Sequence, residues 1–516
     1  MRLFAFIILF VSASFAGLYQ TGSSSLADSQ SQLDRAVLSV LKEKGLKPAE
    51  KCSDTVFLRR IYLDLTGTIP HNWQVREFLK DKSKNKRQKL INKLLGSPEY
   101  ADYWTMKLCD TLRVKAEFPV NLWPNGVQAY YKWIYDSVLN NKPYDKFAQE
   151  ILLSSGSNFR SPPVNFYRAI QGNEPETIAS AAALTFMGIR LENWPDKTSQ
   201  SITPFFSRLC YKGTKEWKEE IIYNDPAAET KLIATLPFGG REVTIDAGED
   251  PRAPFVKWLV SGENDYFAEN MVNRVWYWLM GSGIYTDLDN RRPESRPVNP
   301  KLMSCLKKEF VSSGWDVAHL IKFITSSQTY QQSSMPEQRP AEAEKYFACY
   351  KIRRVEAEVL SDILDKIFGG SSGNYISRIP EPFTFFPAYK KAVSIQDGSI
   401  TSPFLALFGK PSRDTGFLAE RNLEPSAAQS RYLLNSNYIN SKISRSWKLK
   451  KLVRDNRKNG NRIAAGLYLS ILSRPPSQEE LKHALDYSRS SGLNLLNASQ
   501  DIAWALVNSR EFSYKH

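Results

Sequence analysis

The chain has 516 residues, of which 42% are hydrophobic, 12% aromatic and 24% charged. This length is too great for one small module and indicates about two to four domains, and the composition excludes wholesale disorder. The 69 basic residues outnumber the 54 acidic residues and give a formal charge of +15, which favours anionic partners without identifying them. Five cysteines without a CxxC spacing and only four histidines exclude zinc-finger and covalent-haem designs.

The first 16 residues have the features of a secretory signal peptide. Met1-Arg2 gives a positive start, an apolar run covers 3–11, and Ser14-Phe15-Ala16 supplies small residues for cleavage after Ala16. The apolar run ends within about 15 residues, whereas a membrane-spanning helix needs about 20. We therefore expect export to the periplasm, the extracellular space or the cell surface, with no transmembrane segment after cleavage. Because the cysteine count is odd, at least one thiol cannot pair within the chain.

Helical patterns dominate the chain after a Ser-rich linker over 17–32. Ser97-Pro98 supplies a helix cap and a proline at the first helical position, and an alanine-rich helix over 175–187 ends at Gly188. Ser477 and Glu480 form a capping box at the start of another helix. Alternating patterns predict one strand over 241–246 and a second near 392–396. The sequence therefore predicts a mainly α, two-domain multi-helical protein with few short strands.

Connectors rich in proline and glycine divide these elements, and the one over 224–252 is the best domain boundary. We predict an N-terminal helical domain over 33–223, a linker over 224–249 that can form a short strand, and a C-terminal helical domain over 250–516. No internal repeat of fixed period is apparent.

Candidate site residues occur first on the apolar helix over 267–280. Asn273 and Arg274 belong to one polar stripe on this otherwise hydrophobic cylinder, so we expect both to be buried. A buried guanidinium must meet a carboxylate or a group of carbonyls, and it serves either as a structural tie or as a ligand contact.

A second set lies on the helix over 351–368. Arg353 and Glu356 share a stripe with apolar residues, which predicts that they face packed neighbours. Glu358 and Asp362 lie one turn apart, and a solvated face is favoured for them over a cation or acid/base site.

The remaining candidates come from two charged segments. Arg60 and Asp64 stand at i and i+4 on a short helix over 57–66, which predicts a structural pair. Asp414, Glu420 and Arg421 precede a helix that begins after Pro425, where free amide donors could fix a carboxylate or bind an anion; a capping network is the simpler alternative.

Two stretches hold most of the excess positive charge. Seven basic residues lie in 80–93 and eight in 445–462, each against one acidic residue. Neither stretch is interleaved with aromatic residues as a base-stacking surface would be. Together with export, this disfavours nucleic acid and makes an anionic envelope component or polysaccharide the better partner, but a plain solvated face is the favoured interpretation of the charge.

Several long segments resemble the paired domains of unknown function of planctomycete-type secreted, cytochrome-associated proteins, abbreviated PSCyt and PSD. The first domain is similar in FLRRIYLDLTGTIP (57–70), LINKLLGSPEYADYW (90–104), PYDKFAQEILLSSGSNF (143–159) and PPVNFYRA (162–169), the last of which adds Arg168 to the candidate binding residues. The second is similar in 250–284, 313–334, 353–364, 420–435 and 506–512. Many relatives carry a CxxCH run after the alanine-rich helix, but here IRLENWP follows Gly188, which argues against haem attachment in this member.

The resemblance implies an exported setting beside sulfatases and cytochrome-like modules, and sulfated or acidic glycans as partners, but no activity. We therefore expect a binding or assembly module at the cell envelope. The alternative is a hydrolase or lyase acting on polysaccharide through carboxylates drawn from Asp64, Glu356, Glu358, Asp414 and Glu420. Electron transfer would need a cofactor held without Cys-His attachment. No cofactor and no metal are predicted, no common nucleophile or phosphate motif is present, and enzymatic activity and oligomeric state stay open.

Overall fold

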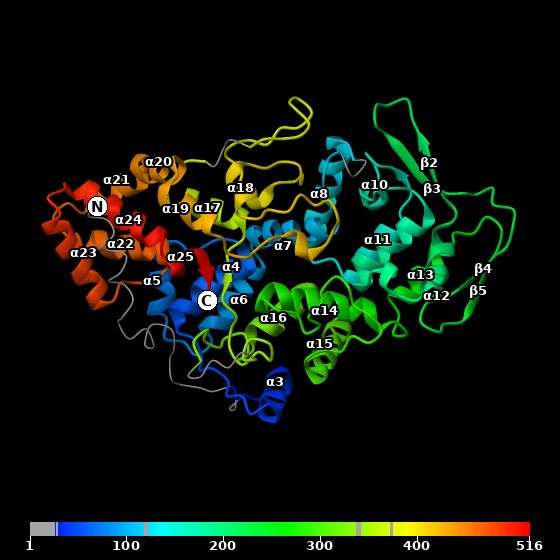
Figure 1. Ribbon diagram of the computed structural model, residues 1–516, viewed down its shortest axis with the longest axis horizontal. Helices are drawn as coiled ribbons and strands as arrows, with labels where there is room; N and C mark the ends of the chain where they lie inside the picture. The colour runs from blue at the N-terminus through cyan, green and yellow to red at the C-terminus, as the bar shows by residue number, and fades with distance from the viewer. Residues whose placement is uncertain (1–25, 27–28, 118–121, 337–341, 372–374) are drawn as a thin grey trace.

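The structure, a computed structural model, describes residues 26, 29–117, 122–336, 342–371 and 375–516 (Figure 1). The predicted signal peptide over 1–16 and most of the predicted linker over 17–32 lie outside these residues. Helices dominate the described residues and the strands are few and short, which confirms the mainly α prediction.

The N-terminal helices begin and end largely where local caps predict. In chain order they are α3 (Gln32–Glu43), α4 (Asp54–Thr66), α5 (Asn72–Lys80), α6 (Lys86–Leu95), α7 (Pro98–Thr111), α8 (Pro124–Leu139), α9 (Tyr144–Leu152), η2 (Pro162–Val164), α10 (Asn165–Arg168), α11 (Pro175–Met187), η3 (Leu191–Asn193), α12 (Asp196–Ile202) and η4 (Thr203–Phe206). Ser97 caps α7 by accepting the amide of Tyr100, and Gly188 ends α11 with a left-handed φ of 68°.

Among the described residues, seven short strands form three small antiparallel sheets. They are β1 (Gly156–Ser157), β2 (Leu209–Gly213), β3 (Glu220–Asn224), β4 (Leu232–Thr235), β5 (Glu242–Ile245), β6 (Arg353–Arg354) and β7 (Tyr514–Lys515), in the orders β1-β3-β2, β4-β5 and β6-β7. The strand predicted over 241–246 corresponds to β5. The strand predicted near 392–396 is wrong: this segment contains the 3-10 turn η5 (Ala392–Ser394), because the Asp362 carboxylate accepts the amides of Ala392 and Val393.

The C-terminal helices follow in two groups. The first group is α13 (Arg252–Leu259), α14 (Asp265–Met280), α15 (Pro300–Ser312), α16 (Val317–Ser326), α17 (Ala357–Phe368), α18 (Pro403–Leu407) and η6 (Leu418–Glu420). The second is α19 (Ala427–Asn435), α20 (Asn437–Arg445), α21 (Trp447–Asp455), α22 (Gly460–Leu472), α23 (Gln478–Ser490), α24 (Leu495–Val507) and α25 (Arg510–Ser513). The capping box of Ser477 and Glu480 is present at α23, as predicted.

Segments from both predicted halves share one hydrophobic core. Buried apolar residues of α4, α7 and α11 belong to the same continuous cluster as those of α14, α17 and α22. Trp104 of α7 meets Trp278 of α14 edge to face, with ring centroids 5.7 Å apart. Figure 1 shows α20–α24 at one end of the long axis, α11–α13 and the hairpins at the other, and the last residues returning to α4 in the middle. Residues far apart in sequence are therefore brought together in the centre.

All five cysteines lie within the described residues, and no disulfide joins any two of them. Of the helices that the structure describes, none combines the length and the apolar character needed to cross a membrane.

Candidate functional site

Asp64 lies at the centre of a buried charged group, here called the interior cluster, which consists of Asp64, Lys107, Arg353, Glu356 and Lys515. Arg353 donates to the Asp64 carboxylate at 2.8 Å, and the Lys515 ammonium lies 3.1 Å from the same oxygen. The two cations lie side by side because Arg353 of β6 is paired directly with Lys515 of β7, and opposite residues of an antiparallel pair project to the same face. The hydroxyls of Tyr330 and Tyr350 donate to the other Asp64 oxygen.

Glu356 is the second carboxylate of the interior cluster. Lys515 contacts it at 3.0 Å and Lys107 at 3.2 Å, and the Tyr103 hydroxyl donates to it at 2.7 Å. Burial opposes ionisation, but the two lysines and this hydrogen bond hold the pKa of Glu356 well below its ordinary value. Three cations face two carboxylates, and burial together with the nearby charge of Lys515 lowers the pKa of Lys107 to about 8.

The predicted pairing of Arg60 with Asp64 is wrong. Arg60 donates instead to the backbone carbonyls of Tyr330, Gln332 and His516, and its guanidinium lies 3.7 Å from the Tyr350 ring centroid. The i, i+4 rule describes neighbours on a solvated helix surface. Because Arg60 and Asp64 are both buried in α4, chain segments from distant parts of the sequence satisfy these two side chains separately.

A second buried group, here called the bridging cluster, consists of Asp110, Glu358, Arg413 and Arg421. Arg413 and Arg421 both donate to Asp110, at 2.9 and 2.8 Å, and Arg421 also spans Glu358 with contacts of 2.7 and 3.0 Å. Burial opposes ionisation of Asp110, but these arginines hold its pKa below the ordinary value. The predicted solvated face is therefore wrong for Glu358, which is buried against Arg421, and for the half-buried Asp362, which binds the amides of η5.

Asp414 and Glu420 form a loop network beside the bridging cluster. Asp414 pairs with Lys115, and Ser412 donates to both carboxylates. Glu420 accepts the backbone amides of Asp414 and Thr415, and these bonds and Ser412 hold its pKa below the ordinary value against the effect of burial. The following helix α19 is capped by its own Ser426 and Gln429. Glu420 thus closes the preceding loop and does not cap that helix.

The polar stripe of α14 joins it to two other segments. Arg274 donates to the carbonyls of Thr185 and Leu184, at 2.6 and 3.0 Å, in the last turn of α11. This confirms the expected carbonyl group, since the C-terminal end of a helix carries partial negative charge. Asn273 accepts the amides of Ile284 and Tyr285. Arg168, the remaining candidate, pairs with Glu220 of β3 at 2.5 Å and connects α10 to the small sheet.

The interior and bridging clusters have the properties of structural ties. Their carboxylates are buried, each contacts at least one cation, and Glu356 and Asp110 stay ionised far below neutral pH. A general acid needs a pKa near the working pH and access to substrate. Within the part of the chain that the structure describes, no group of three or more His, Cys, Asp or Glu side chains could hold a metal ion.

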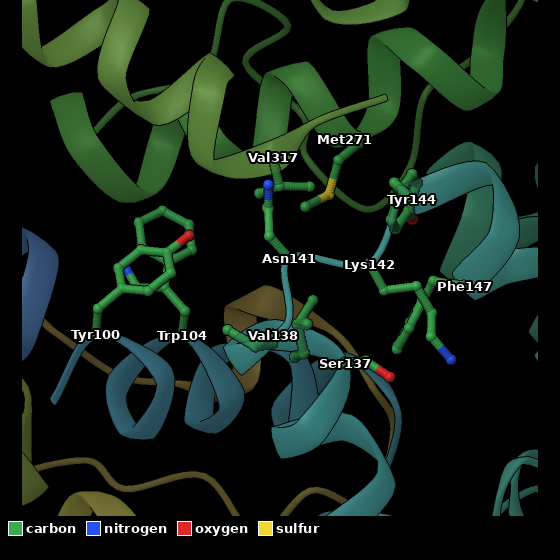
Figure 2. A pocket seen from close by; sticks show the side chains of 11 residues that line it. Tyr100, Trp104, Ser137, Val138, Asn141, Lys142, Tyr144, Phe147, Met271 and Val317 are labelled. Carbon is green, nitrogen blue, oxygen red and sulfur yellow. The ribbon is translucent and has the colours of Figure 1, made fainter. Parts of the chain in front are cut away.

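Three cavities are lined by other residues. The first, of about 40 Å³, lies between α7, α8 and the α14–α16 region, and Figure 2 shows Tyr100, Trp104, Met271 and Val317 around it. The buried indole N–H of Trp104 has no hydrogen-bond partner in the structure. This first cavity is large enough for water molecules but too small for a sugar or a cofactor. A second, open groove of about 600 Å³ runs between α3 and α15.

The third cavity, here called the α21 groove, is an open groove of about 710 Å³. It is lined by Trp447, Lys450, Lys451, Val453, Arg454, Arg457, Leu495 and Leu496. Four of these residues are cations, and the neighbouring Asp455 contacts only Lys451 and Arg454 among them. The apolar residues come from α21 and from the first turn of α24, and Trp447 is 59% exposed.

Sequence patterns missed several of these residues. No sequence pattern marks Lys107, Lys515 and Asp110, because their partners Glu356 and Arg413 lie 159 to 303 positions away. The cations and the tryptophan of the α21 groove lie in the predicted basic stretch 445–462, whereas Leu495 and Leu496 lie outside it. The excess of basic residues does not by itself mark Trp447 as a surface feature. A tryptophan directly after a helix-capping serine in a run of lysines was the available indication.

The fold and these sites define a mainly helical protein with buried ionic ties and a basic surface groove. Two family models match the sequence: PSCyt2, a protein of unknown function (DUF1549), over residues 32–194, and PSD1, a protein of unknown function (DUF1553), over residues 251–488. The chain carries both domains and belongs to the planctomycete-type proteins that pair them. No curated protein and no solved structure matches the chain.

Proposed function

We propose that this protein is an exported binding module of the cell envelope and that its α21 groove binds an anionic polysaccharide. The α21 groove is the observation that carries this proposal, because four cations line one open concave surface and, among the described residues, a single carboxylate, Asp455, pairs with two of them. The formal charge of +15 gives the same preference to the whole molecule.

The shape of the groove favours a chain over a small ion. Lys450, Arg454 and Arg457 follow one another at spacings of four and three residues, so they form one stripe along and just beyond α21. All three side chains are exposed. A linear polymer with regularly placed sulfate or carboxylate groups can contact several of these cations at once, and each contact is weakened by salt.

Retention on immobilised heparin tests the proposal. The mature protein should bind at low ionic strength and elute in a salt gradient, whereas uncharged agarose should not retain it. The variant Lys450→Gln/Arg454→Gln/Arg457→Gln should elute at clearly lower salt, because it removes three positive charges from the groove. Glutamine favours a helix about as well as lysine and arginine do, so α21 should stay intact.

A matched control separates the groove from the overall charge. Lys82→Gln/Lys84→Gln/Lys89→Gln removes the same charge from exposed lysines of the other basic stretch. Its elution should stay near that of the unmodified protein. Equal shifts for the two triple variants would show that net charge alone drives retention and would reject the groove as the site.

A further inference from the structure

Trp447 is held in place on both sides by the end of α17. The Ser446 hydroxyl donates to the carbonyl of Phe368 at 2.7 Å and also caps α21 by accepting the amide of Leu449. The Lys448 ammonium donates to the carbonyl of Lys366 at 2.5 Å. The side chains of the residues before and after Trp447 thus both bind carbonyls at the end of α17.

The indole itself is seated on a glycine. A Cβ added at Gly369 would lie 2.3 Å from the Trp447 Nε1 atom, far inside contact distance, so the ring packs directly on the bare backbone. Gly369 also has a φ of +79°, which favours glycine. One side of the indole is therefore fixed, while the residue lines the groove and is 59% exposed to solvent.

A fixed, exposed indole beside a row of cations fits an anionic sugar. A pyranose ring has a face of C–H groups that packs on an aromatic ring, and its sulfate or carboxylate groups project from the ring edge toward neighbouring cations. A polyanion without sugar rings can use only the cations. If charge alone drove binding, the indole packed on Gly369 would have no role in it.

We infer that Trp447 is a stacking platform that makes the α21 groove selective for sugar rings that carry anionic groups, over polyanions in general. This inference rests on the proposed function and specifies the ligand class of the same groove.

Two ligands of similar charge test it: heparin, which is a sulfated polysaccharide, and linear polyphosphate, which has no sugar rings. Trp447→Ala should weaken heparin binding by about 3- to 10-fold, the range of one aromatic stacking contact, and leave polyphosphate binding unchanged. Trp447→Phe should recover most of the loss. Trp73→Ala is the matched control, because Trp73 is 58% exposed on α5, outside the α21 groove.

A pair of glycine variants tests the packing of the indole on Gly369 without removing the indole. Gly369→Ala forces the ring to move, whereas Gly370→Ala has a similarly positive φ of +96° but meets no atom within 4 Å. The Gly369 variant should lose heparin affinity and the Gly370 variant should not, at comparable thermal stability.

The outcomes separate the two proposals. If the groove triple variant binds heparin as well as the unmodified protein, the proposed function fails. If that variant loses affinity but Trp447→Ala affects heparin and polyphosphate equally, or affects neither, the proposed function stands and the selectivity inference is overturned.

Discussion

Replacing Lys515 with methionine should destabilise the protein strongly. The Lys515 side chain is fully buried, and its ammonium lies 3.1 Å from Asp64 and 3.0 Å from Glu356. Methionine keeps the volume but removes the one cation that contacts both carboxylates. Because Glu356 then keeps only Lys107 as a close cation, we expect the free energy of unfolding to fall by about 3–5 kcal/mol, the usual cost of breaking a buried ion pair.

Urea unfolding followed by circular dichroism measures this loss. Lys107→Met is the control, because it removes the surplus third cation and should cost less than about 2 kcal/mol. In the double variant Lys515→Met/Glu356→Gln, the second change should recover more than about 1 kcal/mol, since it removes the carboxylate left without Lys515. Equal costs for the two lysine variants, or strict additivity in the double variant, would refute the assignment of Lys515 as the central tie.

Three further predictions each concern one charged side chain. Burial and the charge of Lys515 lower the pKa of Lys107 to about 8, so the unfolded chain binds more protons than the folded chain between pH 8 and 10.5. The free energy of unfolding should therefore rise by up to about 2 kcal/mol from pH 8 to 10. Urea titrations of Lys107→Met should lack that rise. Burial raises the pKa of Asp362 to about 7, so the folded chain binds more protons between pH 4 and 7; stability should fall with rising pH in this window, and Asp362→Asn should flatten the slope in the same assay. Arg274→Met leaves the carbonyls of Leu184 and Thr185 without their donor and should lower the free energy of unfolding by about 2–3 kcal/mol. Amide exchange at the end of α11 should become faster. Faster exchange in α14 alone would contradict the tie between the two helices.

Local elements of the fold could be predicted because their determinants are adjacent in sequence. Ser97, Gly188 and Ser477 fix helix ends through contacts within a few residues, and the structure places these ends as predicted. The strand predicted near 392–396 failed because a distant carboxylate, Asp362, binds the amides that a strand would need. Tertiary contacts override local pattern at such positions.

The charged candidates show the same limit. The sequence indicated that Arg274 and Glu356 would be buried, because both lie on apolar stripes. It could not name their partners, since Glu356 meets Lys107 and Lys515 across separations of 249 and 159 residues. The α21 groove could not be predicted for a related reason. The first turn of α24 packs beside α21 and creates the concave surface, and no local pattern encodes that packing.

Hydrogen–deuterium exchange of the mature chain, with and without heparin, tests the central claim most directly. If the buried charges are structural ties and ligand binds at the surface, heparin should slow amide exchange in α21 and in the first turn of α24. Exchange around Asp64, Asp110 and Glu356 should stay the same. Protection of those buried segments with α21 unchanged would contradict the account.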